Sequence, residues 1–497
     1  MSLSIIRSRA ARGIEAPPVS VEVHLSNGLP SFTIVGMAET AVKESKDRVR
    51  SAILNANLEF PQKRITVNLA PADLPKEGGR FDLPIAMGIL AASDQLKADG
   101  VHAYEFYGEL ALDGKLRAIR GLVPALTAAR RARAQAVIPK GNAGEAGYIR
   151  NATIYQASHL LDVTAVFNSE RSLDPVEPAP LTEQTSDLDL QDVRGQHNAK
   201  RALLIAAAGG HNLLMVGPPG SGKTMLAMRL PGLLPPLNDE EVLEVAAIRS
   251  VAGQPTDWQR SASRPFRRPH HSCSSVALVG GGSQPRPGEI SLAHRGVLFL
   301  DELPEFSRHA LEQLREPMEA GAVHIARAAH QTTYPSDFQL IAAMNPCPCG
   351  YLGEERCRCT PDQIQRYRAR ISGPLLDRVD THIEVPAVSH DKLHAEPQGE
   401  STAEVRLQVT AAQNFQLRRQ GCLNKDLNIR STERHCALRS PAQSLLNRAM
   451  EQLGLSARAY HRIVRLARTI ADLEQNVDIE TSHISEAIQL RYLDRRV

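Results

Sequence analysis

The stretch LLMVGPPGSGKTMLAMRL, residues 213–230, limits the fold of this chain more than any other feature. An apolar run typical of a buried strand leads into a glycine-rich turn that fits the pattern G-x-x-x-x-G-K-[ST], and residues with helical periodicity follow. In such a turn, backbone N–H groups point inward at phosphate oxygens, and the start of the next helix adds partial positive charge. The stretch therefore predicts an α/β domain that binds a nucleotide on a parallel sheet.

This turn, called the phosphate loop below (residues 217–224), supplies the expected nucleotide ligands. Lys223 is expected to reach the β- and γ-phosphates, and Thr224 to place its hydroxyl on Mg²⁺. We therefore expect ATP and Mg²⁺ as cofactors. The rest of the cradle is expected to come from Gly217, Pro218, Pro219, Gly220, Ser221 and Gly222.

Polar side chains follow two further apolar runs. GVLFLDEL, residues 296–303, delivers Asp301 and Glu302 at the end of a predicted strand, where open α/β sheets hold their ligands. We expect Asp301 to hold Mg²⁺ and Glu302 to orient and deprotonate the attacking water. FQLIAAMNP ends in Asn345, which is expected to fix the same water. The alternative for Asp301 and Glu302 is a solvated acidic turn.

Four cysteines follow Asn345 within one short segment, CPCGYLGEERCRC. Four thiolates on one loop can close a tetrahedral Zn²⁺ site, and this loop has few apolar residues to hold its shape. We predict structural zinc, with free thiols or a redox pair as the alternative. The predicted ligands are Cys347, Cys349, Cys357 and Cys359.

Length and composition predict several domains. A chain of 497 residues exceeds what one hydrophobic core usually serves. Residues 167–192 are rich in Pro, Ser, Glu and Asp and have no apolar period, which indicates a linker. We therefore predict domains over 1–166, 193–400 and 401–497. Neither a signal peptide nor a long apolar run is evident, so we expect a cytoplasmic protein with no membrane partner.

The last predicted domain consists of helices. Ser or Thr precedes several of its segments, as N-caps do, and apolar residues recur every three and four positions. Arg458, Arg462, Arg465 and Arg468 recur along one of these helices. We expect most of them to form a solvated face.

Five segments in order resemble the AAA+ ATPases of the magnesium-chelatase-like branch: GPPGSGKT, LFLDE, AAMNP, ISGPLLDRVD and LSARAYHRIVRLARTIADL. The resemblance implies that Arg378 is a finger arginine, which reaches the nucleotide of a neighbouring subunit, and that Arg458 is the sensor arginine of the lid. The active form would then be a homo-oligomeric ring, most often a hexamer. The alternatives are a surface ion pair for Arg378 and a helix-face charge for Arg458.

The N-terminal part, over residues 28–92 and 106–146, resembles the Lon-protease-like domain of the ComM/YifB family, bacterial ATPases linked to natural transformation. The resemblance spans the chain and implies an α/β protein: an α+β Lon-protease-like (ribosomal S5 domain 2-like) domain, an AAA+ parallel-sheet P-loop domain and a C-terminal helical lid. A Lon protease needs a serine nucleophile and a lysine base. Here Arg80 and Val123 stand at those positions, so we expect a scaffold that aids assembly or contacts DNA, without protease activity.

Two segments are expected to line the pore of such a ring. One is the polar, glycine-rich insertion over residues 265–289, and the other is AVHIARAAHQTTYP, which alternates like a hairpin and carries Arg327 and His330 near its tip. Arginines in a narrow pore would bind DNA phosphates without sequence preference. The alternatives are that these loops only pack between subunits, and that Arg267 and Arg268 serve the nucleotide interface.

The resemblance implies an ATP-driven ring motor that moves along single-stranded or branched DNA. Such a helicase or branch-migration factor would extend joint molecules during homologous recombination in natural transformation, beside a recombinase. Two alternatives remain. One is a motor subunit of a metal chelatase, and the other is a protein-remodelling ATPase or protease regulator, whose pore loops are expected to offer an aromatic residue.

Overall fold

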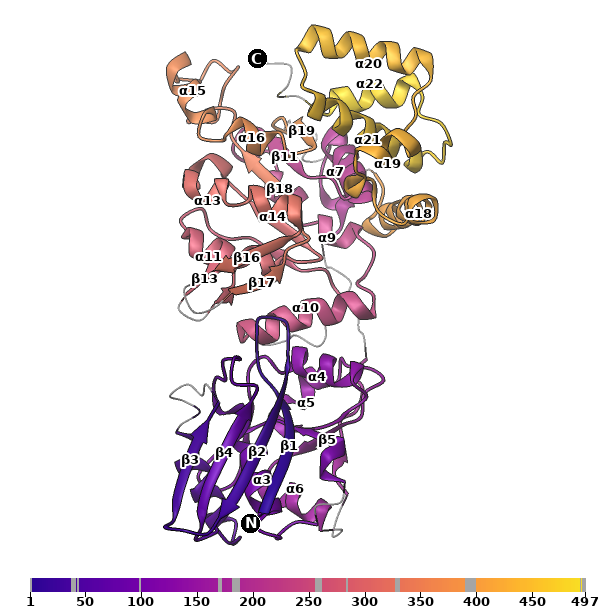
Figure 1. Ribbon diagram of the computed structural model, residues 1–497. Helices are drawn as coiled ribbons and strands as arrows, with labels where there is room; N and C mark the ends of the chain where they lie inside the picture. The colour runs from indigo at the N-terminus through magenta and orange to yellow at the C-terminus, as the bar shows by residue number, and fades with distance from the viewer. Residues whose placement is uncertain are drawn as a thin grey trace. The chain divides into compact units, whose positions relative to one another are not determined.

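The computed structural model describes residues 2–36, 42, 44–97, 100–168, 172–180, 188–254, 262–282, 285–326, 331–388, 399–491 and 493 (Figure 1). The chain forms two compact units, each built from three segments. The first comprises Met1–Thr182, Asn238–Ala262 and Ala328–Tyr334. The second comprises Glu183–Leu237, Ser263–Arg327 and Pro335–Val497.

An eight-stranded mixed sheet forms the frame of the first unit, in the order β10-β9-β8-β5-β1-β2-β4-β3. Its long strands alternate buried and less buried residues, as a sheet with one face on the core requires. β1, β2 and β4 pair antiparallel, whereas β3 pairs parallel with β4. The strands are β1 Ser2–Arg9, β2 Pro18–Ser26, β3 Ser31–Val35, β4 Arg64–Ala70, β5 Tyr104–Phe106, β8 Gln135–Pro139, β9 Ile154–Ala157 and β10 Asp174–Pro175; β6 Glu109–Leu110 and β7 Leu116–Arg117 form a separate pair.

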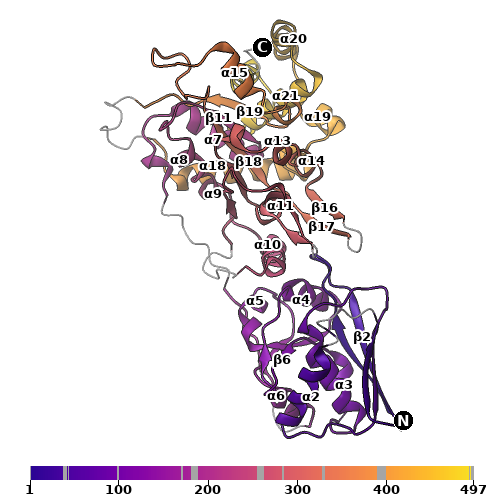
Figure 2. The same cartoon turned by 90° about the vertical axis from the view of Figure 1, so that its left-hand side faces the viewer.

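One helix of the first unit, α3 (Asp82–Ala92), is buried along its whole length and packs on β1 and β2 (Figure 2). A Cβ atom at Gly88 would lie 2.5 Å from Cγ2 of Val23, so only glycine allows this close packing. The other helices are α2 Ser45–Asn55, α4 Leu122–Arg131, α5 Ala143–Ala146, α6 Leu160–Phe167 and α10 Asp239–Ala252.

Helix α10 lies in the middle of the sequence, yet it belongs to the first unit and packs on α4. Asn238 caps its start, with its side chain accepting hydrogen bonds from Glu240 and Glu241 N–H groups. Near its end, Ser250 Oγ accepts a hydrogen bond from Leu122 N (3.1 Å) and donates one to Glu145 Oε2 (2.7 Å). The first unit is therefore completed by a segment that follows the phosphate loop in sequence.

A five-stranded parallel sheet lies at the centre of the second unit, in the order β12-β15-β18-β11-β19. Three of its strands are buried at every position, as expected when both faces of a parallel sheet are covered. This confirms the predicted α/β architecture. The strands are β11 Leu213–Val216, β12 Phe266–Arg267, β15 Val297–Leu300, β18 Gln339–Met344 and β19 Thr381–Glu384.

Helices and short pairs of strands surround this sheet. They are α7 His197–Gly209, α8 Lys223–Ala227, α9 Leu230–Leu233, α11 Ser275–Val279, α12 Glu289–Leu292, α13 Arg308–Glu312, α14 Arg315–Ala320, α15 Pro361–Arg368 and α16 Gly373–Leu376. β13 Gly280–Gly281 pairs with β14 Arg286–Pro287. β16 Ala322–Ala326 pairs with β17 Gln331–Pro335 as the predicted hairpin, and residues 331–334 of β17 are grouped with the first unit.

The C-terminal region is helical, as predicted, and shares one hydrophobic core with α7 and the parallel sheet. Ser401 and Ser456 cap its two longest helices. The helices are α18 Thr402–Gln420, α19 Ile429–His435, α20 Ser440–Leu453, α21 Ala457–Leu473 and α22 Thr481–Gln489.

The expectation that most arginines of α21 form a solvated face is wrong. Arg468 is only 2% exposed, and its Nε lies 3.0 Å from Asp472 Oδ1. Arg465 donates to the carbonyls of Lys425 and Leu427, and Arg462 pairs with the buried Asp380. Buried carboxylates and carbonyls satisfy these guanidinium groups, so the helix turns its arginines inward.

Candidate functional site: a phosphate loop beside two acidic residues

The phosphate loop connects β11 to α8 in the second unit. Gly220 and Gly222 have φ angles of +75° and +91°, a region that favours glycine. The ammonium of Lys223 lies inside the loop, where it donates to the carbonyls of Gly217 (2.7 Å) and Pro218 (2.8 Å). Burial lowers the pKa of Lys223, and the nearby carboxylates of Asp301 and Glu302 oppose this effect.

The parallel sheet brings the predicted polar residues to the phosphate loop. Thr224 donates from Oγ1 to Asp301 Oδ2 at 2.9 Å, which joins the start of α8 to the end of β15. Lys223 Nζ lies 3.3 Å from Asn345 Oδ1, at the end of β18. Three adjacent strands, β15, β18 and β11, thus end at one group of side chains. A hydroxyl and a carboxylate within hydrogen-bond distance are the hard oxygen donors that Mg²⁺ prefers.

Glu302 follows Asp301 in a left-handed backbone conformation, with φ +52° and ψ +48°. Its side chain is 54% exposed, and its Oε2 lies 3.2 Å from His271 Nδ1. Arg268 donates from Nη2 to Asp301 Oδ2 at 2.8 Å. One short segment, RRPHH, which begins at the last residue of β12, therefore contacts both acidic residues.

Sequence reasoning missed His271 and left the position of Arg268 open. Their strand, β12, has only two residues, too few for a recognisable pattern. The available signal was a run of two arginines and two histidines, which by itself resembles any polar loop. The run is significant because β12 pairs with β15, and Asp301 directly follows β15.

The two arginines assigned by resemblance lie in different surroundings. Arg378 is 9% exposed, and its Nη2 lies 2.6 Å from Glu319 Oε1. Arg458 is exposed in the first turn of α21. Within the described residues, neither has a hydrogen bond or ion pair with the phosphate loop of its own chain.

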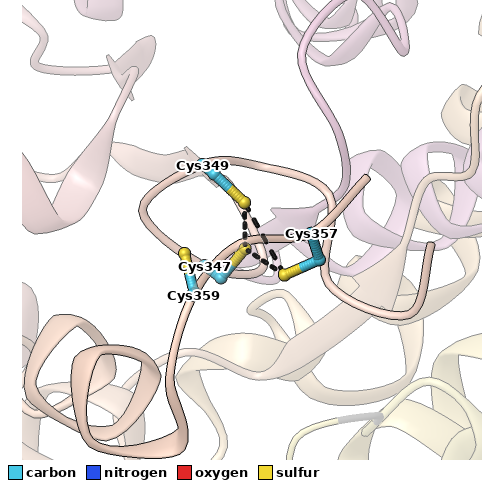
Figure 3. A group of neighbouring side chains, drawn as sticks. All are labelled: Cys347, Cys349, Cys357 and Cys359. Carbon is cyan, nitrogen blue, oxygen red and sulfur yellow. Dashed lines mark hydrogen bonds between the residues drawn. The ribbon is translucent and has the colours of Figure 1, made fainter. Parts of the chain in front are cut away.

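The four predicted cysteines form a single cluster after β18 (Figure 3). All four sulfur atoms lie within 4.8 Å of one another. The Sγ atoms of Cys347, Cys349 and Cys357 are separated by 3.4, 3.6 and 3.9 Å. Hydrogen bonds from the backbone of Tyr351 and Arg358 lower the pKa of the Cys349 thiol to about 6. The neighbouring thiols raise the pKa of Cys357 and Cys359, so the lowered pKa favours the thiolate at Cys349.

This cysteine loop (residues 347–359) also packs on the phosphate loop. A Cβ atom at Gly350 would lie 2.5 Å from Cδ of Pro219, so the two loops touch at a glycine. Arg368 donates to the carbonyl of Pro346, between Asn345 and the first cysteine. The cysteine loop is therefore directly connected to two parts of the candidate site.

In the first unit, Arg80 and Val123, which the resemblance implies stand at the positions of a Lon dyad, are both buried. Arg80 donates from Nη2 to the carbonyl of Arg120 at 2.7 Å, three residues before the buried Val123. Burial lowers the pKa of Arg80.

Arg327 and His330, the predicted DNA contacts, lie outside the described residues. β16 and β17 flank them in sequence. Among the residues that the structure describes, no helix is both long and apolar enough to cross a membrane.

These features define a class of protein. Three features of this chain are characteristic of AAA+ ATPases. A phosphate loop connects a central parallel strand, β11, to a helix. Acidic residues follow β15, which lies two places from β11 in the sheet, and the C-terminal region is helical. Three family descriptions match the chain: "Magnesium chelatase, subunit ChlI" over residues 189–393, "Subunit ChlI of Mg-chelatase" over 21–142 and "Magnesium chelatase, subunit ChlI C-terminal" over 399–491.

Relatives match over the whole chain. A protein of Salmonella typhimurium named YifB is 52% identical, and the competence protein ComM of Haemophilus influenzae is 51% identical; each alignment covers 100% of this chain and 98% of the relative. The chain belongs to the ComM/YifB family of chelatase-like AAA+ ATPases. A magnesium-chelatase 67 kDa subunit of Chlorobaculum parvum is 27% identical over 161 residues, which is 31% of this chain and 23% of that protein.

Proposed function

We propose that this chain is the subunit of a homo-oligomeric ring, a hexamer, that uses ATP to move along single-stranded or branched DNA. In this role it is a helicase or branch-migration factor, acting in the cytoplasm beside a recombinase while incoming DNA is integrated by homologous recombination in natural transformation. The observation that carries the proposal is the meeting of Lys223, Thr224, Asp301 and Asn345 at one edge of the sheet. The name of the competence protein ComM supports the link to DNA uptake.

The residues at this edge fit ATP and Mg²⁺. Bound Mg²⁺ would neutralise charge on the phosphates, held by the Thr224 hydroxyl and the Asp301 carboxylate. Lys223, released from the carbonyls of its own loop, would bind the β- and γ-phosphates. Glu302 would accept a proton from the attacking water, and Asn345 would orient that water. The rest of the phosphate loop would bind phosphate oxygens through its backbone.

The cysteine loop fits a structural zinc ion. Tetrahedral Zn²⁺ with Zn–S bonds of about 2.3 Å places its sulfur ligands about 3.8 Å apart. The three measured separations, between 3.4 and 3.9 Å, bracket that value. Zinc held by Cys347, Cys349, Cys357 and Cys359 would fix the segment that follows Asn345.

Assembly into a ring would complete the nucleotide site and form the pore. Arg378 would reach the nucleotide of a neighbouring subunit, and Arg458 would carry the lid onto the γ-phosphate. Arg327 and His330 would meet DNA phosphates in the pore, where each positive charge is repeated around the ring. The first unit, a Lon-like fold without a catalytic dyad, would support assembly.

The test is the steady-state ATPase rate of the full chain with and without forked DNA, at two salt concentrations. We expect DNA to stimulate the wild-type rate, salt to reduce that stimulation, and Arg327→Ala to abolish it. Glu302→Gln should remove turnover while retaining ATP binding. If DNA has no effect and a protein substrate raises the rate, the DNA assignment fails and the protein-remodelling alternative is favoured.

A further inference from the structure

The cysteine loop and the helix that follows it have no hydrophobic core of their own. Residues 351–366 are all described, and none of them is buried. Buried residues hold only the two ends of this segment, with Cys347 and Gly350 before it and Tyr367 after it. A segment that buries so little apolar surface cannot offset the entropy of its own ordering, so it needs a crosslink. The four sulfur atoms can supply that crosslink, and the shape of the loop therefore depends on their chemical state.

Both ends of the cysteine loop are attached to the candidate site. Asn345, which is expected to orient the attacking water, lies two residues before the first cysteine. Gly350 has a φ angle of +86°, and a Cβ atom there would lie 2.5 Å from Cδ of Pro219 in the phosphate loop. Beyond the last cysteine, Arg368 of α15 donates from Nη2 to the carbonyl of Pro346 at 3.3 Å. A rearrangement of the sulfur atoms would therefore displace groups on which ATP hydrolysis depends.

The sulfur atoms are close enough to bond to one another. The Sγ atoms of Cys347, Cys349 and Cys357 are separated by 3.4, 3.6 and 3.9 Å, and Cys359 Sγ lies within 4.8 Å of all three. The sulfur atoms of a disulfide are about 2.05 Å apart, so each sulfur can reach a partner by a local movement. Such a bond would remove two of the thiolates that hold zinc.

Thiolate character and exposure distinguish these four cysteines from the others. Zinc keeps its cysteine ligands deprotonated, and the thiolate is the form that oxidants attack. Three cysteines of the cluster are also partly exposed, so a small oxidant can reach them. Burial raises the pKa of Cys273, Cys422 and Cys436, in the last case to about 11, which keeps these three as thiols. Oxidation should therefore begin at the cluster.

We propose that the cysteine loop is a peroxide-sensitive switch that turns off the ATPase. Hydrogen peroxide oxidises the four zinc-bound thiolates to two disulfides, zinc is released, and the loop no longer holds Asn345 and Pro219 in place. For each disulfide, two thiolates give one electron each to one peroxide molecule, whose O–O bond breaks, and two protons from solvent complete two water molecules. This inference rests on the ATPase function and the zinc ion proposed above.

Peroxide treatment of the zinc-loaded full chain tests the inference. Zinc release to a chromogenic chelator, the number of free thiols and the ATPase rate are followed in one sample. We expect each subunit to release its zinc and to lose the four thiols of the cluster. The ATPase rate should fall about tenfold or more, since a small misplacement of reacting groups can cost that much. Dithiothreitol with added zinc should restore the thiols, the bound zinc and the rate.

The sequence itself allows the disulfides to be located. Trypsin cleaves after Arg356 and Arg358, which separates Cys357 and Cys359 from each other and from the first two cysteines. Mass spectrometry under non-reducing conditions should find every disulfide within the cluster of one subunit. A disulfide that includes a cysteine outside the cluster, or one that joins two subunits, would overturn the inference.

A matched variant separates the cluster from the other thiols. Cys273→Ser combined with Cys422→Ser removes the two partly exposed cysteines outside the cluster, and this chain should respond to peroxide as the wild type does. The inference is overturned if this variant is insensitive to peroxide, or if the ATPase rate falls while zinc stays bound. It is also overturned if zinc leaves without a change in rate, or if the purified wild type contains no zinc. A zinc-loaded wild type without ATPase activity before oxidation would instead refute the proposed function.

Discussion

At the scale of single residues, the candidate site depends on side chains that the phosphate-loop motif does not include. Glu302 is the expected base, and its side chain is half exposed. His271 lies against it and Arg268 against Asp301. We interpret these contacts as the means by which β12 positions both acidic groups, since β12 is the neighbour of β15 in the sheet.

The position of His271 leads to the first prediction. His271→Ala should lower kcat for ATP roughly tenfold while KM stays near the wild-type value, because the variant misplaces the base and leaves the phosphate ligands intact. His271→Gln, which keeps a hydrogen-bonding group, should recover part of the loss. His270→Ala serves as the neighbouring control. A change in KM alone would show that His271 acts on binding.

A buried histidine predicts a pH dependence of stability. Burial lowers the pKa of His211 to about 4, while nearby Asp380 opposes the effect. Because the folded-state pKa lies below the ordinary value, the unfolded chain binds more protons between about pH 4 and 6.5. The free energy of unfolding should therefore fall with decreasing pH across this range, by up to roughly 3 kcal/mol.

The measurement is the urea midpoint of the full chain at several pH values. His211→Gln cannot titrate, so its midpoint should change less between pH 6.5 and 4.5 than that of the wild type. His102→Gln, at an exposed histidine of the first unit, should follow the wild type. Parallel pH profiles for His211→Gln and wild type would contradict the assignment.

At the scale of elements, the sequence was informative where a motif fixes local geometry. The phosphate loop, the acidic residues after β15 and Asn345 after β18 were predictable because each follows an apolar run, and parallel strands end at one edge. The inward orientation of the α21 arginines was not predictable from the sequence. Their partners include Asp380 and carbonyls far away in sequence, which helical periodicity does not reveal.

The buried acid of α21 gives an element-scale prediction. Asp472 accepts from Arg468 Nε (3.0 Å), Arg419 Nη2 (2.9 Å) and Asn424 Nδ2 (2.8 Å). Asp472→Asn should lower the free energy of unfolding by about 3–5 kcal/mol, because it leaves buried positive charge uncompensated. The exposed pair of Asp478 and Arg439 provides the control, and Asp478→Asn should cost no more than about 1 kcal/mol. If chemical denaturation shows equal losses of unfolding free energy for Asp472→Asn and Asp478→Asn, this account is contradicted.

The cysteine loop gives a second prediction at the scale of elements. Purified full chain should contain one zinc ion per subunit by elemental analysis, and Cys357→Ser should lose it together with much of the ATPase activity, because the loop packs on Pro219. Cys273→Ser, at a cysteine outside the cluster, should keep both. A metal-free wild type with full activity would favour the free-thiol alternative.

At the scale of the whole molecule, the two units alternate along the chain. Residues 1–182 belong to the first unit, 183–237 to the second and 238–262 to the first again, and residues 328–334 return to it once more. Apolar periodicity predicted helices and strands but could not show which unit α10 completes. Its contacts with α4 are tertiary, and a motif-based boundary places it with the phosphate loop.

This alternation can be tested by cutting the chain. A protease site inserted between residues 181 and 187 should yield two fragments that elute together in native gel filtration, because α10 in the larger fragment packs on α4 in the smaller. The fragments should separate in urea. A nick that releases residues 1–182 under native conditions would show that α10 is dispensable for the first unit.

The placement of α10 also limits how such proteins can be recombined. Exchanging N-terminal domains between two relatives by joining them at the linker would leave a helix from one parent packed on a partner from the other. Ser250, which hydrogen-bonds both α4 and Glu145, would then face a foreign surface. A working chimera must therefore take α10 and the N-terminal segment from the same parent. In this family, the segments that are exchanged together are expected to be separated in the sequence.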